Sequence, residues 1–237
     1  MPQGTIRHFG VLIPSTNTTV ETEYSRLLPP EWQAHYARVK SASIDGSPFS
    51  PPLDADVAYQ SRMLGTARVE AVFLVQTSAS LFTDDFDAAS MRRMDAGAGV
   101  PSFTSAMAIG EAMNALGTKR VALVSPYSIP VNASAKRYYE GRYGLDIVAI
   151  EGFAATDSYA IGNLGPEMAR DAFARIDRPE IEAFIVPGGN FPTMASIAGW
   201  EREFNKPVVT TNQAALWAML RRLNTPDRIP GLGRLLE

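Results

Sequence analysis

The sequence contains no cysteine and only two histidines, His8 and His35, among its 237 residues. Without cysteine the chain can form no disulfide, no thiolate nucleophile and no metal–sulfur site, and two histidines do not suffice for a multi-histidine metal centre. An excess of positive charge is also missing, since 22 Lys and Arg residues stand against 25 Asp and Glu residues. We therefore expect no metal and no cofactor built on one, and neither nucleic acid nor a membrane as a partner.

Long apolar runs are missing as well, because none of them exceeds the length of a strand. No positively charged and then apolar leader opens the chain, so we expect a cytoplasmic protein. Apolar residues make up 46% and charged residues 20% of the sequence, a balance typical of globular proteins. A chain of this length can bury one large core or two smaller lobes.

Short apolar runs that end in small polar residues alternate with stretches of helical periodicity. The apolar runs predict buried parallel strands at Phe9–Ile13, Ala71–Val75, Val121–Val124 and Ala183–Val186. The periodic stretches predict helices at Asp54–Val69, Asn132–Arg142, Pro166–Ile176 and Asn212–Leu223. This alternation predicts an α/β fold with parallel sheets and right-handed crossovers.

The spacing of the predicted strands repeats along the chain. Equivalent strand positions lie 111 residues apart in two cases, Val11 with Ala122 and Phe73 with Phe184. The segment Pro101–Ser105 resembles the segment 106 positions further on, and a predicted helix follows both. We therefore predict two pseudo-symmetric lobes from a duplicated unit, each a parallel sheet flanked by helices, with a cleft between them.

Ligands of such proteins bind beyond the carboxyl ends of the strands, where the lobes face each other. We place the first lobe at residues 1–115 and the second at residues 116–207, with residues 208–237 packing back onto the first. Four strand-end segments then face the cleft: Pro14–Thr19, Gln76–Ser80, Ser125–Ser128 and Pro187–Asn190. They offer hydroxyls, amides and backbone N–H groups but no Lys or Arg, which predicts a pocket that binds a carboxylate or oxyanion with neutral donors. The Ser, Thr and Asn residues of the first segment are equally typical of a helix N-cap, and both interpretations stay open.

The motifs at these strand ends resemble the aspartate/glutamate racemase superfamily, in the branch that holds maleate cis-trans isomerase and arylmalonate decarboxylase. The resemblance covers essentially the whole chain. It is carried by these segments: Pro14–Thr18 with Glu21 and Glu23, Thr77–Ser80, Tyr127, Val131–Asn132, Gly188–Gly189, Lys206–Val209 and Pro230–Leu235.

The resemblance implies two lobes that close over a small acid without any metal or organic cofactor. It implies neutral donors around a substrate carboxylate, which stabilise an enediolate or an equivalent charged intermediate. By position, the substrate-binding residues would be Ser15, Asn17, Thr77, Ser78, Gly189 and Asn190, the last two through their backbone. Tyr127 is a further donor and, with Gln76 and Gly188, a candidate for the catalytic positions.

Two family positions depart from this pattern. The racemases and isomerases carry one cysteine at the second strand end and one at the fourth, where this chain has Gln76 and Gly188. Two-cysteine racemisation and a covalent cysteine route are therefore excluded, because neither residue can act as an acid, base or nucleophile. Tyr127 is the best-placed titratable replacement, although a phenol needs a lowered pKa to act as a base. A water held by Gln76 in the space that Gly188 leaves is a second option.

The sequence predicts a lyase or decarboxylase that acts on a small carboxylate or dicarboxylate through an enediolate-type intermediate, without cofactor and without cysteine. Carbon–carbon cleavage fits best because it needs charge stabilisation first and a proton only afterwards. Two alternatives stay open: a non-catalytic carboxylate-binding relative, and a hydrolase or hydratase in which Gln76 positions water. The carboxylate is the expected small-molecule partner, and the sequence leaves open whether the chain forms a homodimer.

Overall fold

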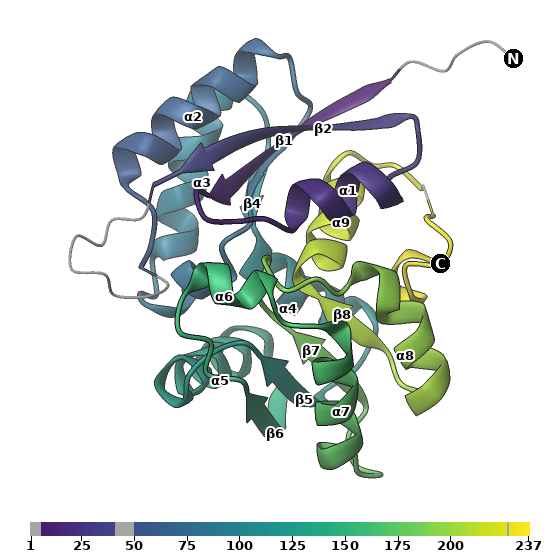
Figure 1. The fold of residues 1–237 in the computed structure, drawn as a ribbon. Helices are drawn as coiled ribbons and strands as arrows, with labels where there is room; N and C mark the ends of the chain where they lie inside the picture. Colours follow the sequence, from purple (N-terminus) through teal and green to yellow (C-terminus); the bar gives the residue numbers. More distant parts are fainter. Residues whose placement is uncertain (1–5, 41–49, 227) are drawn as a thin grey trace, which may run out of the picture.

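The computed structural model describes residues 6–40, 50–226 and 228–237 of the chain. The strands of the first half are β1 (Arg7–Pro14), β2 (Trp32–Val39), β3 (Val72–Leu74) and β4 (Ser102–Thr104). Those of the second half are β5 (Arg120–Ser125), β6 (Asp146–Gly152), β7 (Ala183–Val186) and β8 (Val208–Thr210). Within the described ranges they form two parallel sheets with the orders β2-β1-β3-β4 and β6-β5-β7-β8, which Figure 1 shows one above the other.

Helices connect the strands in both halves. The first half contains α1 (Val20–Leu27), α2 (Asp54–Thr66), α3 (Phe86–Ala98), α4 (Ser105–Ala115) and the 3-10 helix η1 (Thr77–Leu81). The second contains α5 (Ile129–Tyr143), α6 (Ser158–Gly162), α7 (Pro166–Ile176), α8 (Ile197–Phe204), α9 (Thr211–Arg222) and the 3-10 helices η2 (Met194–Ser196) and η3 (Arg234–Leu236). None of the described helices combines the length and the apolar character that crossing a lipid bilayer requires.

The two sheets repeat one strand order and one register, which confirms the predicted pair of pseudo-symmetric lobes. Val11 of β1 pairs with Phe73 of β3, and Ala122 of β5 pairs with Phe184 of β7. These are the positions that recur at a spacing of 111 residues in the sequence.

The expected position of the last segment needs one correction. Strand β8 pairs with β7, so residues 208–210 belong to the second sheet and not to the first lobe. Helix α9, which follows directly, then packs against α4 of the first half. The strand stays with its own sheet because its backbone needs the ladder hydrogen bonds of β7. The boundary between residues 115 and 116 stays a prediction.

The apolar core explains why both faces of the strands are buried. Phe9, Val11 and Ile13 of β1 belong to a large core that extends into the second lobe, whereas Leu12 belongs to a smaller core under α2 and α3. Successive side chains of a strand point to opposite faces, so a strand buried on both faces has a continuous apolar sequence. The larger core is continuous across both lobes, and the lobes therefore pack as one unit.

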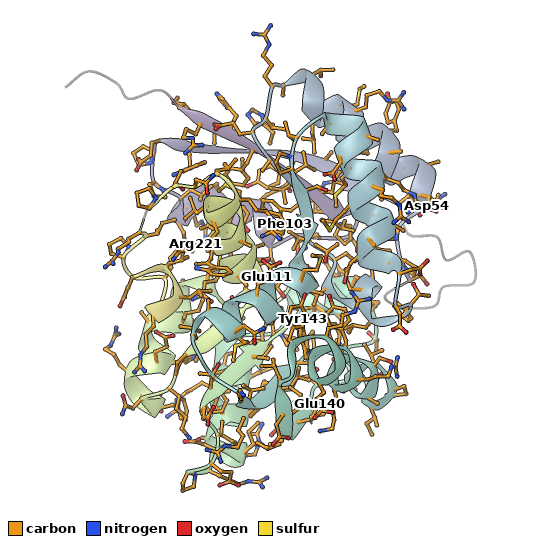
Figure 2. All side chains as sticks on the ribbon, turned by 180° about the vertical axis from the view of Figure 1, so that it is seen from behind. Asp54, Phe103, Glu111, Glu140, Tyr143 and Arg221 are labelled. Carbon is orange, nitrogen blue, oxygen red and sulfur yellow. The ribbon has the colours of Figure 1, made fainter. Side chains whose placement is uncertain are left out.

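Behind the cleft, helices of the two halves lie directly against each other. Gly110 of α4 approaches the ring of Tyr143 at the end of α5 so closely that a Cβ at Gly110 would overlap it. Arg222 at the end of α9 makes a two-pronged ion pair with Glu111 of α4, with Nη–Oε distances of 3.0 and 2.9 Å. Figure 2 shows Glu111 and Tyr143 at this junction, seen from behind. The junction fixes how the strand ends of the two sheets face each other.

Candidate functional site

A pocket of about 40 Å³ lies where the strand ends of the two sheets meet. Because a water molecule needs roughly 10–15 Å³ by this measure, the pocket has room for a small ligand. Its lining comes from both halves of the chain: Pro14, Thr16, Asn17, Val75, Gln76, Thr77, Ser78, Tyr127, Ser158, Ile161, Gly188, Gly189 and Asn190. Eight of the nine site residues that the sequence indicated therefore come together here.

Ser15 is the predicted site residue that the structure does not bring to the pocket. It is exposed and does not belong to the lining, which its neighbour Thr16 joins instead. Its backbone is used in local structure, since its N–H donates to the carbonyl of Val39 and its own carbonyl accepts from Arg38. Successive residues at the end of β1 face opposite sides, which turns Ser15 outward.

Asn17 combines the two interpretations of the first segment. Its side-chain Oδ1 accepts from the backbone N–H groups of Thr19 and Val20, both at 3.0 Å, so it caps the start of α1. Because Oδ1 is engaged in these bonds, the amide turns its NH₂ group to the remaining side. Asn17 is buried and lines the pocket, where this NH₂ group is a neutral donor for a carboxylate.

The hydroxyl of Thr77 is the centre of a buried network. Its Oγ1 lies 3.0 Å from Oγ of Ser105 and 3.0 Å from Oγ1 of Thr211, and it also makes a hydrogen bond with Tyr127. A hydroxyl has one hydrogen and two lone pairs, so three partners use its full capacity. The side chain of Thr77 therefore has no hydrogen-bonding position left, and its backbone N–H is the group that can still meet a ligand.

Tyr127 is a neutral donor in this pocket. Only 2% of the residue is exposed, and burial raises the pKa of its phenol well above the ordinary value of 10, although the hydrogen bond with Thr77 opposes the rise. The shift is opposite to the one that a general base needs, so Tyr127 stays protonated at neutral pH. Of the described residues that line the pocket, Tyr127 is the only one with a titratable side chain.

Gly188 and Gln76 are the two candidate catalytic positions whose side chains can act neither as an acid nor as a base. Gly188 has φ +112°, a left-handed conformation that favours glycine, and a Cβ placed there would lie 2.9 Å from Cγ of Pro126. The backbone and the ring of Pro126 therefore leave little room for a side chain at this position, and a water held by Gln76 beside Gly188 stays a prediction. Gln76 lines the pocket but donates its Nε2 hydrogen to the carbonyl of Ser50 at 2.7 Å.

Four backbone N–H groups complete the donor set. Those of Thr77 and Ser78, at the start of η1, and those of Gly189 and Asn190, after β7, have no acceptor among the described residues. The N–H of Gly188 is not part of this set, because it donates to Oγ1 of Thr211 at 2.8 Å. Unpaired donors at helix starts and strand ends favour an anion in the space between them.

The side chain of Asn190 is used in bonds within the protein, and the role of its backbone toward a ligand stays a prediction. Its Oδ1 accepts from the N–H of Thr18 at 2.7 Å, and its Nδ2 donates to the carbonyl of Ser158 at 2.7 Å. The amide thus joins the loop before α1 in the first lobe to α6 in the second.

Three residues of the lining lie outside the four predicted segments: Val75, which directly precedes the second segment, and Ser158 and Ile161 of α6. The start of this short helix has a recognisable signal, since Asp157 caps it by accepting from the N–H of Ala160 at 2.8 Å. No local pattern, however, indicates that the helix folds over the pocket. The acidic residues that follow the second strand end, Asp84 and Asp85, are exposed and do not line it.

The chemistry of the pocket is therefore that of neutral hydrogen-bond donors. Within the described ranges, no three His, Asp or Glu side chains come close enough together to hold a metal ion. Donors fixed in a partly dry site stabilise a carboxylate, and more strongly a charge that develops next to it, because they need not reorganise.

Comparison with known proteins gives one consistent family. The family model described as arylmalonate decarboxylase matches residues 9–236. Maleate isomerase of Nocardia farcinica is 29% identical over 98% of this chain and 96% of its own length. Arylmalonate decarboxylase of Bordetella bronchiseptica is 25% identical over 100% of this chain and 99% of its own length.

Solved structures agree with these relatives. A cysteine-to-alanine variant of the maleate isomerase of Pseudomonas putida S16, with maleate, superposes with a TM-score of 0.88 at 26% identity, covering 98% of both chains. A cysteine-to-serine variant of the Nocardia farcinica isomerase, with a covalently bound succinylcysteine intermediate, gives a TM-score of 0.87 at 27% identity, again covering 98% of both chains.

Proposed function

Because the chain belongs to the arylmalonate decarboxylase family and is an enzyme of the isomerase and decarboxylase type, we propose that it cleaves a carbon–carbon bond to a carboxylate. The substrate is a small carboxylate or dicarboxylate, the intermediate is an enediolate, and no cysteine takes part. The observation that carries this proposal is the composition of the pocket. It contains neutral donors from both lobes, and its one titratable side chain, Tyr127, is a protonated phenol.

Decarboxylation matches such a pocket because the bond that breaks leaves its electron pair on the substrate. One carboxylate departs as carbon dioxide, and the pair moves from the broken bond into the remaining carboxylate, which becomes an enediolate. The N–H groups of Thr77, Ser78, Gly189 and Asn190, with the Tyr127 hydroxyl, then stabilise the added charge. A proton from water afterwards reaches the carbon that lost the carbon dioxide. No step before this protonation needs a base.

Isomerisation through a covalent cysteine adduct is less compatible with this chain. The Nocardia farcinica relative has been seen with a succinylcysteine, and such an adduct needs a thiol that this sequence does not contain. Racemisation by proton abstraction would need a base beside the substrate carbon, and Tyr127 is held in the opposite protonation state.

Proton NMR in deuterated water tests the reaction class directly. The purified protein is incubated with phenylmalonate, methylmalonate, maleate and aspartate in parallel. We expect a malonate to be lost with carbon dioxide release and one deuterium to appear on the product carbon, while maleate and the α-proton of aspartate persist. Formation of fumarate, or deuterium uptake into intact aspartate, would contradict the proposal.

A variant of the central hydroxyl connects this reaction to the pocket. Thr77→Val keeps the shape of the side chain but removes the hydroxyl that orients Tyr127, so we expect decarboxylation about tenfold or more slower. Thr66→Val makes the same chemical change at an exposed position and should keep the wild-type rate. If every acid stays unchanged while malonate binds to the wild type and less tightly to Thr77→Val, the pocket is a carboxylate-binding site without turnover.

A further inference from the structure

Glu23 is a buried carboxylate that lies outside the lining of the pocket. It belongs to α1 of the first lobe, and all its described partners belong to the second. Its Oε1 accepts from the backbone N–H groups of Thr193 at 2.7 Å and Met194 at 2.8 Å. Its Oε2 accepts from Nδ2 of Asn212, at the start of α9, at 2.6 Å. Burial raises the pKa of this carboxyl above its ordinary value, and the three hydrogen bonds oppose the rise. A carboxyl group that accepts from three donors across a lobe boundary fixes their relative positions.

Asn212 connects Glu23 to a peptide of the pocket lining. Its Nδ2 also donates to the carbonyl of Gly189, at 3.1 Å. In a planar trans peptide the C=O and the following N–H point in opposite directions. A hydrogen bond that holds the carbonyl of Gly189 on the side of Asn212 therefore turns the N–H of Asn190 to the other side. Both residues of this peptide line the pocket.

The orientation of the Asn212 amide is set by its partners. Nδ2 serves two acceptors, whereas Oδ1 is buried and has no hydrogen-bond partner among the residues that the structure describes. Turning the amide over would place Oδ1 against both Glu23 and the Gly189 carbonyl, where two acceptors would face a third. In the observed orientation Nδ2 of Asn212 donates to Gly189, and Oδ1 is left unpaired among the described residues.

The hydrogen bond from the Asn212 amide to the Gly189 carbonyl belongs to one lobe. At the repeat spacing of 106 positions, Thr211 corresponds to Ser105, and both hydroxyls contact Thr77. Asn212 corresponds to Ala106, which has no side-chain donor. The second lobe alone therefore holds its strand-end peptide with an amide.

We propose that Asn212, held by Glu23, is a positioning residue that aims the Asn190 N–H at the substrate carboxylate. This inference rests on the proposed function only where it concerns turnover of the bound carboxylate. The direction of the Asn190 N–H affects carboxylate binding whether or not a reaction follows. Since Glu23 stands on the first lobe and the donor on the second, the donor is aimed only when the two lobes are docked.

Two variants remove the hydrogen bond from Asn212 to Gly189 in different ways. Asn212→Leu keeps a similar shape but offers no donor to Gly189. Glu23→Gln keeps the volume of the side chain but turns an NH₂ group toward Asn212. The Asn212 amide must then rotate to present Oδ1, which withdraws its donor from Gly189.

Tyr24→Phe is the matched control. The Tyr24 hydroxyl, on the same helix as Glu23, crosses the same boundary and donates to the backbone carbonyl of Asn212 at 2.8 Å. Its removal costs a buried hydrogen bond at the same place without touching the amide that holds Gly189.

The experiment measures malonate affinity by calorimetry, together with the ¹⁵N–¹H amide shifts of Gly189 and Asn190 in the ligand-free protein. We expect Asn212→Leu and Glu23→Gln to bind malonate about tenfold or more weakly and to move both amide signals. Tyr24→Phe should lower the unfolding temperature but keep the affinity and both signals. Unmoved amide signals in the first two variants, or equal effects in all three, would overturn the proposal. Because neither readout needs turnover, an inactive wild type would contradict the decarboxylation and leave this test intact.

Discussion

The phenol of Tyr127 shows how burial decides which role a residue can take. Burial raises its pKa above the ordinary value of 10, so at any pH below that value the group donates a hydrogen bond and does not accept a proton. We expect Tyr127→Phe to lower decarboxylation about tenfold to a hundredfold, because one donor to the charged intermediate is lost.

The pH dependence separates this role from that of a base. Rates of the wild type and of Tyr127→Phe, measured between pH 6 and 9, should run parallel. An alkaline or acidic limb that disappears in the variant would show that the phenol titrates, against the direction of its pKa shift.

The backbone conformation of Gly188 disfavours any side chain at this position, including that of cysteine. A side chain at φ +112° is strained, and its Cβ would press against Pro126, so we expect Gly188→Cys to lower the free energy of unfolding by about 1–3 kcal/mol. Gly188→Ala should lower it by the same amount, because the backbone and the Cβ cause the loss. Gln76→Cys, at φ −141°, introduces no such strain and should cost only the hydrogen bond to the Ser50 carbonyl, about 1 kcal/mol.

Deuterium uptake into a chiral arylpropionate tests whether these thiols restore proton transfer. Gly188→Cys with Gln76→Cys should exchange the α-proton if the introduced thiols reach the intermediate, whereas Gly188→Ala should show background exchange only. Wild-type stability in Gly188→Cys, measured by urea unfolding, would contradict the proposed strain.

At the scale of elements, the 3-10 helix η1 depends on a carboxylate beneath it. Asp87 of α3 accepts at Oδ1 from Ser80 at 2.6 Å and from Thr104 at 2.7 Å. Its Oδ2 accepts from Tyr138 at 2.5 Å and forms an ion pair with Arg142 at 3.3 Å, both on α5. One buried carboxylate thus joins η1, the cap of α4 and the first helix of the second lobe.

Replacing this carboxylate should loosen all three elements together. We expect Asp87→Asn to lower the free energy of unfolding by about 1.5–3 kcal/mol, because hydrogen bonds to a charged acceptor become weaker and fewer. Glu180→Gln, which removes an exposed carboxylate that lies 3.9 Å from Arg178, should change it little. Urea unfolding compares the two, and equal losses would contradict a special role for Asp87.

At the scale of the whole molecule, the lobes share one core and several polar contacts across the cleft. The side chain of Asn190, a residue of the pocket lining, is one of these contacts, since it holds Thr18 of the first lobe and Ser158 of the second at once. The lobes are therefore linked beside the pocket as well as through the shared core.

Removing this link should affect both lobes at once. We expect Asn190→Ala to speed amide hydrogen exchange around Thr18 and around Ser158 together, and to weaken malonate binding, because the loop and α6 are released. Asn114→Ala, on the exposed side of α4, should leave both measurements unchanged. Faster exchange around only one of the two segments would show that Asn190 does not couple the lobes.

Local chain geometry carried the prediction of the elements. Pro166–Ile176 has the bounds that helical periodicity indicated, because a helix repeats every 3.6 residues. Ala183–Val186 has the bounds of a continuous apolar run, because a strand buried on both faces is apolar at every position. The repeat of 111 residues also predicted two equivalent lobes, and the two sheets share one register because a duplicated unit keeps it. Composition alone showed that no thiol chemistry is available.

The tertiary structure decided which groups of the pocket residues bond within the protein and which are left for a ligand. Whether a hydroxyl, an amide or an N–H serves a ligand depends on which of its hydrogen-bonding positions are already used, and the partners come from distant parts of the chain. The hydroxyl of Thr77 makes a hydrogen bond with Thr211, 134 residues away, and the amide of Asn212 donates to Glu23, 189 residues away. A sequence determines which donors a chain possesses, but only folding brings together the groups that use some of them and leave the others for the ligand.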